Sequence, residues 1–188
     1  DARHPFGTEN ACVFFADDTY LEPLAVGQRE DCEATATKGN QFTRRDQAYR
    51  FRNGDDGFSA IALKSDDADK DHKRFKKAGI SAGKKLVFGR TMVDAAGKQA
   101  KATFKLAFSA DLRAPDAFAF TCQRLNVPAV DRSALQAHAN GVTGIADIVA
   151  SEPNASDYQY WLQYVAANRE TVAHSFGMSL AMGAVELD

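Results

Sequence analysis

Residues 58–80, FSAIALKSDDADKDHKRFKKAGI, predict one strand followed directly by one helix. The strand is indicated at 58–64 by a short segment rich in apolar residues. Ser65 is a suitable N-cap, because its hydroxyl can accept a hydrogen bond from a free backbone amide. Aspartates then fill the first turn, and Lys and Arg fill the last, as the helix dipole favours. Gly79 is the expected end of the helix.

A second stretch with the same order lies nearer the C-terminus, at residues 144–168. It begins GIADIVASEPNASDYQYWL, in which 144–150 predicts a strand and Pro153 suits the first turn of a helix. Apolar residues then recur at helical spacing, from Tyr158 to Val165. We expect Asn168 to end this helix and two further strands to follow at 174–187, joined around Gly183.

Other short elements surround these two strand–helix pairs. Residues 27–56 are polar and poorly periodic, with one short helix expected at 44–51, and 127–140 is expected to be a linker. Short apolar segments separated by turn residues predict the remaining strands. These are 11–16 and 19–26, which form a hairpin, and 86–93, 102–108 and 117–123.

The bulk composition is that of an ordinary globular protein. The chain has 188 residues, 45% of them hydrophobic, and a formal net charge of -2. This charge gives no reason to expect nucleic acid as a partner. No apolar run is long enough to span a membrane, so a cytoplasmic location without membrane attachment is expected. The three cysteines fit neither a disulfide framework nor a zinc–thiolate site.

Two polar motifs near the N-terminus carry a resemblance to a known family. HPFGTEN at 4–10 and TYLEPLAV at 19–26 resemble the HxxGTxN and YLEL signatures of a glyoxalase-like branch of the vicinal-oxygen-chelate superfamily. The strand–helix steps at 58–80 and 144–162 resemble the modules of the same superfamily. The resemblance covers most of the chain.

The resemblance implies an α+β fold of βαβββ modules, in which paired modules curl their sheets into a cup around the site. This chain would hold a curved mixed sheet that is incomplete at both ends. We expect a glyoxalase-like domain at 1–126, with its second module starting near residue 57, and the start of a further module at 127–188. Strands for the partial modules would come from a second copy in a homodimer, from residues beyond this chain, or from the first and last modules joining each other.

The resemblance also implies a divalent metal, such as Mn, Fe, Zn or Ni, held by carboxylate or imidazole ligands. The implied metal ligands are Glu22, Asp147 and Glu186. Ala60 occupies a position where many members place a histidine, and alanine cannot ligate. The alternative for Glu22 and Asp147 is an exposed carboxylate on a strand.

Several other residues are candidates for binding or catalysis. His4 is the candidate proton shuttle, as histidine titrates near neutral pH. The candidates for substrate binding are Thr8, Asn10, Arg90, Gln123, His138 and Asn140. The alternative for the His4–Asn10 loop is a turn whose polar groups hydrogen-bond only to one another. The alternative for Arg90 is an ion pair with a purely structural role.

Two function classes follow from these residues. The first is a metal-dependent lyase, isomerase or dioxygenase acting on a small oxygenated substrate. The second is a non-catalytic protein that binds a small molecule, similar to bleomycin-resistance proteins, and Ala60 favours it. A module that completes a larger assembly is a third possibility. No phosphate loop or dinucleotide fingerprint is present, so no nucleotide cofactor is expected.

Overall fold

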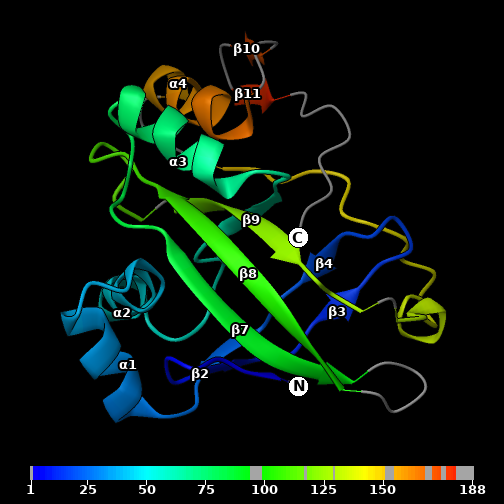
Figure 1. Ribbon diagram of the computed structural model, residues 1–188. Helices are drawn as coiled ribbons and strands as arrows, with labels where there is room; N and C mark the ends of the chain where they lie inside the picture. Colours follow the sequence, from blue (N-terminus) through cyan, green and yellow to red (C-terminus); the bar gives the residue numbers. More distant parts are fainter. Residues whose placement is uncertain are drawn as a thin grey trace.

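The protein is described by a computed structural model, in which a twisted four-stranded sheet lies between helices and small N-terminal sheets (Figure 1). The α+β fold class expected from the sequence is confirmed. The described residues are 2–93, 99–116, 118–128, 130–150, 155–167, 171–174 and 177–180.

The central sheet has the strand order β6-β9-β8-β7. β6 and β9 run parallel, and the other neighbouring pairs run antiparallel, so the sheet is mixed. Helix α3 lies between β6 and β7 in the chain, which gives the expected βαβββ unit. The bounds are β6 Ile61–Lys64, α3 Ala68–Lys77, β7 Leu86–Val93, β8 Gln99–Ser109 and β9 Ala119–Leu125.

Helix α3 confirms the prediction for residues 58–80, with one correction at its start. The N-cap is Asp67 rather than Ser65, because the Asp67 carboxylate accepts a hydrogen bond of 2.9 Å from the Lys70 amide. Ser65 supports the turn one step earlier, where its hydroxyl accepts from the Asp67 amide at 3.0 Å. Both side chains therefore satisfy backbone amides at the helix entrance.

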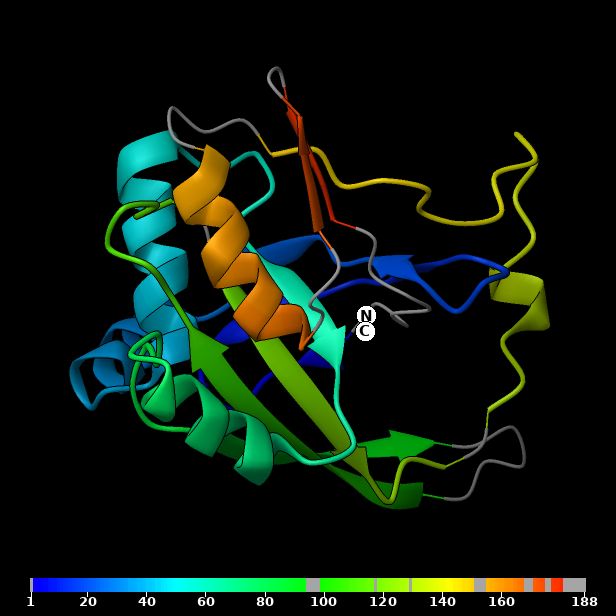
Figure 2. The same cartoon turned by 90° about the horizontal axis from the view of Figure 1, so that it is seen from above.

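The outer face of the central sheet packs against α3 and α4, Ala155–Ala166. The two helices lie side by side above the sheet (Figures 1 and 2). Trp161 and Phe75 have no exposed surface and fill the space between helices and sheet. The apolar helix face predicted around Trp161 is thus confirmed.

The strand predicted at 144–150 is wrong, because these residues have no regular secondary structure. The segment is held instead by the turn at 17–19. The Asp17 amide donates to the Thr143 carbonyl at 3.2 Å, and the Ile145 amide donates to the Thr19 hydroxyl at 3.2 Å. Residues 146–150 are exposed, so their side chains do not pack against a sheet. The two strands expected at 174–187, joined around Gly183, lie earlier in the chain: β10 (Thr171–His174) and β11 (Gly177–Leu180) form an antiparallel pair in which His174 pairs with Gly177. Asn168 and Gly183 lie outside the described residues.

The N-terminal strands form two small sheets below the central one. β3 (Val13–Phe14) and β4 (Tyr20–Leu21) form the expected hairpin. The hairpin ends sooner than predicted, because the following strand pairs with β2 in a separate sheet of order β1-β2-β5. The bounds of this second sheet are β1 Ala2–Arg3, β2 Thr8–Asn10 and β5 Leu24–Val26.

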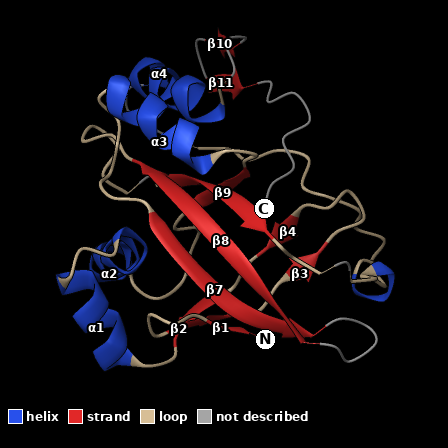
Figure 3. Ribbon diagram, in the orientation of Figure 1, coloured by secondary structure: helices blue, strands red, loops and turns tan. Residues whose placement is uncertain are grey.

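Two helices occupy the polar region where one short helix was expected. They are α1, Arg29–Thr37, and α2, Gln41–Asn53, and a short 3-10 helix, η1, follows later at Ser133–Leu135. Asn40 caps α2, since its side chain accepts from the Phe42 amide at 2.9 Å. The α1–α2 pair lies well apart from the α3–α4 pair (Figure 3). Among the described residues, no helix is long and apolar enough to cross a membrane.

The inner face of the central sheet is covered by α2 and the N-terminal strands. Even-numbered residues of β8 and β9 point to this face, because side chains alternate along a strand. Phe42 of α2 packs against their aromatic cluster. The buried members of the cluster are Ala102, Phe104, Leu106, Phe108, Phe118, Phe120 and Cys122.

Candidate functional site

A polar cluster lies on the inner face, where the N-terminal strands meet β7. Its members are Asn10, Glu22 and Arg90, and we refer to them as the inner cluster. Asn10 is buried at the end of β2, and its Nδ2 donates to Glu22 Oε1 at 2.5 Å. Asn10 Oδ1 is buried and has no hydrogen-bond partner within the described part of the chain. The two N-terminal motifs therefore meet in space, as each contributes one side chain.

Arg90 presents its guanidinium group on the same face of β7. The guanidinium carbon lies 5.0 Å from the centre of the Phe104 ring. Its Nε and Nη1 atoms are buried, and neither finds a hydrogen-bond partner among the residues that the structure describes. Buried donors of a charged group are costly unless they are paired. The cluster therefore has donors suited to an incoming oxygen atom.

Glu22 sits in surroundings that favour its neutral form. Burial raises the pKa of its carboxyl group. The hydrogen bond from Asn10 and the positive charges of Arg90 and Arg124 oppose this shift without cancelling it. Cys12 lies close by, and burial together with the Glu22 charge raises its thiol pKa to about 11. The thiol is thus protonated at neutral pH.

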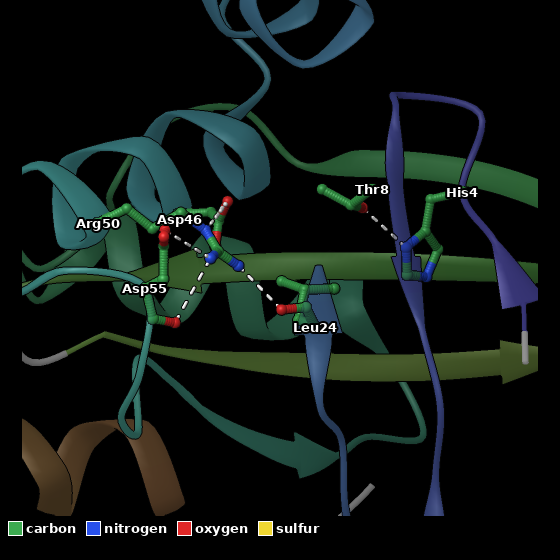
Figure 4. A network of polar contacts seen from close by, with 6 residues as sticks. All are labelled: His4, Thr8, Leu24, Asp46, Arg50 and Asp55. Carbon is green, nitrogen blue, oxygen red and sulfur yellow. Dashed lines mark hydrogen bonds and ion pairs between the residues drawn. The ribbon is translucent and has the colours of Figure 1, made fainter. Parts of the chain in front are cut away.

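His4 lies beside the inner cluster within an aromatic stack. Its Nδ1 and the Thr8 hydroxyl are 2.9 Å apart (Figure 4). The imidazole stacks on Phe6 with 4.9 Å between ring centres, and Phe88 contacts it edge-on at 5.6 Å. Burial, and then the charge of Arg90, lower the His4 pKa to about 4. The imidazole is therefore neutral at physiological pH.

One polar network near the cluster was missed by the sequence analysis. Arg50 of α2 pairs with Asp46 at 3.0 Å and Asp55 at 3.3 Å, and it donates to the Leu24 carbonyl at 2.9 Å (Figure 4). The network ties α2 to β5, the strand that follows Glu22. The i,i+4 spacing of Asp46 and Arg50 was a usable signal for the pair, but nothing local indicated the contact with Leu24.

Gln123 is placed away from the inner cluster. Its Nε2 donates to the Asp66 carbonyl at 2.6 Å, and its Oε1 accepts from the Ala68 amide at 3.3 Å. Both contacts are with the start of α3, on the outer face of the sheet. Its neighbour Arg124 points to the inner face instead, as the alternation of side chains along β9 requires.

His138 and Asn140 lie on the loop that follows η1. His138 Nε2 is 2.7 Å from the Phe14 carbonyl, which attaches the loop to β3. Asn140 is exposed, and its side chain accepts from the Val142 amide at 3.3 Å. Both side chains thus use polar atoms in local contacts, and the structure does not bring them together with Asn10, Glu22 and Arg90.

The implied metal ligands are not gathered at one place. Glu22 lies in the inner cluster, Asp147 is exposed on the 144–150 segment, and Glu186 lies outside the described residues. Ala60 is exposed just before β6. No group of three or more His, Cys, Asp or Glu side chains in the described ranges is arranged to hold a metal ion. The described residues therefore do not fit a metal centre.

Comparison with known proteins gives one match. A family model described as a glyoxalase-like domain matches residues 1–166. No curated protein and no solved structure matches the chain significantly.

Proposed function

Since the chain belongs to the glyoxalase-like domain family of the vicinal-oxygen-chelate superfamily, we propose that it binds a small, oxygen-rich molecule at the inner cluster. One observation carries this proposal. Two nitrogen atoms of Arg90 and the side-chain oxygen of Asn10 are buried without hydrogen-bond partners in the described part of the chain, and both residues interact with Glu22. A ligand with adjacent oxygen atoms would satisfy both side chains.

The chemistry of the three side chains suits such a ligand. The planar guanidinium fork of Arg90 matches a carboxylate, or two neighbouring oxygens, through parallel hydrogen bonds. Asn10 Oδ1 is an acceptor and would pair with a ligand hydroxyl. The raised pKa of Glu22 lets its carboxyl group donate a hydrogen bond when protonated. The cluster thus offers both donors and acceptors within an aromatic surrounding.

A thermal-shift screen tests the proposal. The panel contains glyoxylate, 2-hydroxy acids and catechol, each carrying adjacent oxygens. At least one compound should raise the melting temperature of the wild-type protein and fail to do so for Arg90→Met. Arg44→Met is the matched control, because Arg44 is an exposed arginine on α2. A ligand that stabilises Arg90→Met as strongly as the wild type would refute the role of Arg90.

Metal-dependent lyase, isomerase or dioxygenase activity is the second candidate. Glu22 is the one implied ligand that lies in the inner cluster, where Asn10 holds its orientation, so a metal there would need further ligands from outside the described residues. Elemental analysis of the purified protein separates the candidates. Mn, Fe, Zn or Ni near one atom per chain, reduced in Glu22→Gln, would support the enzyme. Metal-free protein that still binds a panel compound would support the binding protein.

A further inference from the structure

A cavity of about 380 Å³ opens where the parallel strands β6 and β9 end. Three cationic side chains line it from separate parts of the chain: Lys64, Arg124 and Arg132. We propose that this cavity binds a phosphate-type oxyanion. The proposal goes beyond the inner cluster, because none of its three members lines the cavity.

The fold explains why the three cations converge. Lys64 is the last residue of β6 and pairs with Cys122 of β9, so Arg124 lies just beyond it on the neighbouring strand. The carboxyl ends of parallel strands lie at the same edge of a sheet, and chain segments leaving this edge can surround a ligand. Arg132 comes from the segment that follows β9, immediately before η1.

The β3–β4 hairpin orients the two arginines through its aromatic rings. The Arg132 guanidinium carbon lies 4.6 Å from the centre of the Phe14 ring, and that of Arg124 lies 6.0 Å from the Tyr20 ring. Phe14 and Tyr20 contact each other at 5.5 Å between ring centres. A guanidinium stacked on a ring directs its N–H groups sideways, in its own plane, where they can reach an oxyanion.

The charge lining the cavity favours an anion of limited size. Two carboxylates, Asp18 and Asp66, also line it, so the three cations remain in excess by one charge. Asp18 accepts a hydrogen bond from the Gln136 side chain at 3.1 Å, which ties it to η1. The volume is in the range of small-molecule sites. Together with the net charge of -2 for the whole chain, it argues for a small ligand rather than nucleic acid.

Isothermal titration with inorganic phosphate tests the site, with chloride used to hold the ionic strength constant. The wild-type protein should show saturable binding at one site. Arg132→Met and Lys64→Met should each weaken the affinity by about tenfold, since each removes a charge-assisted hydrogen bond. Arg44→Met is the matched control and should bind as the wild type does. Absence of saturable binding by the wild type would overturn the proposal, as would affinity equal to that of the wild type in both cavity variants.

Two further titrations test which phosphate compound binds and whether it binds in this cavity. Glycerol 3-phosphate replaces inorganic phosphate in a parallel titration, and tighter binding of the ester would favour an organic phosphate over free phosphate as the ligand. Arg90→Met should bind phosphate as the wild type does, which separates this cavity from the inner cluster. If Arg132→Met fails to fold by circular dichroism, Lys64→Met decides alone, because Lys64 is exposed at the end of its strand.

Discussion

Arg90→Met should stabilise the folded protein while removing ligand binding. The change deletes the guanidinium group from the inner face and keeps a long, flexible side chain beside Phe104. Methionine fills an irregular apolar space well and carries no donor that needs a partner. A functional residue that is costly to bury is expected to show this opposition between stability and binding.

The magnitude follows from the contacts of Arg90. Its Nε and Nη1 are buried without partners in the described part of the chain, and each such donor costs about 1 kcal/mol or more. The cation–π contact of the guanidinium group with Phe104 stabilises the folded protein by about 1 kcal/mol, and the variant loses this contact. Arg90 also attracts the Glu22 carboxylate, and the loss of this attraction offsets part of the gain. The variant should therefore gain about 1 kcal/mol, which raises the melting temperature by about 2–4 °C in a chain of this size.

Urea unfolding followed by tryptophan fluorescence measures the effect. The chain has one tryptophan, Trp161, and it is fully buried in the outer core. Arg44→Met, at an exposed position, should stay within about 0.5 kcal/mol of the wild type. Destabilisation of Arg90→Met by more than about 1 kcal/mol would show that the guanidinium group makes a net structural contribution, and the reasoning from its unpartnered nitrogens would fail.

Three other predictions concern the N-terminal region and assembly. Gly7→Ala should cost about 3 kcal/mol or more in a urea titration, because Gly7 has φ +92° and an added Cβ would lie 2.5 Å from the Gln28 carbonyl oxygen. Gly39→Ala, at φ +91° with no atom within 4 Å, is its control and should cost only about 1 kcal/mol. Because the pKa of His4 is lowered from 6.5 to about 4, the stability from its neutral form is present above pH 6.5 and lost as pH falls toward 4. His4→Phe should therefore lose about 2 kcal/mol less than the wild type between pH 7 and pH 5, and equal losses in both proteins would contradict this pKa. The homodimer expected from the sequence predicts twice the mass of one chain by light scattering, and a stable monomer would exclude it.

The sequence predicted those elements whose signals are local. Residues 58–80 carry an apolar strand, capping aspartates and a terminal glycine in order, and β7 is marked off by its apolar run from 86 to 93. Helices α1 and α2 lack a clear apolar stripe. They are instead held by tertiary contacts such as that between Arg50 and the Leu24 carbonyl. Such contacts between distant segments leave no periodic pattern, which is why one short helix was expected there.

The 144–150 segment shows the opposite failure. Its apolar residues predict a strand, but a strand needs a neighbouring strand to form hydrogen bonds with its backbone groups. Here the Thr19 hydroxyl accepts a hydrogen bond from the Ile145 amide, and the Thr143 carbonyl accepts one from the Asp17 amide. These bonds to a turn take the place of a ladder of hydrogen bonds to a neighbouring strand. Composition alone does not reveal whether a partner strand is available.

The candidate site was partly accessible from the sequence. The two N-terminal motifs placed Asn10 and Glu22 among the candidates, and the structure joins them by a hydrogen bond. Gln123 was selected on β9, although its neighbour Arg124 is the residue that points to the inner face. A shift of one residue along a strand moves a side chain to the other face, and the exact strand register could not be read from the sequence.

The most direct test of the central claim is the nitrogen-15 NMR signal of the Arg90 Nε–H group, assigned by its loss in Arg90→Met. The ligand is the compound identified in the thermal-shift screen. We expect this signal to shift on titration and to saturate with the same dissociation constant as ligand binding measured on the whole protein. A ligand that binds and saturates while the Arg90 Nε–H signal stays in place would contradict the claim that the inner cluster is the binding site.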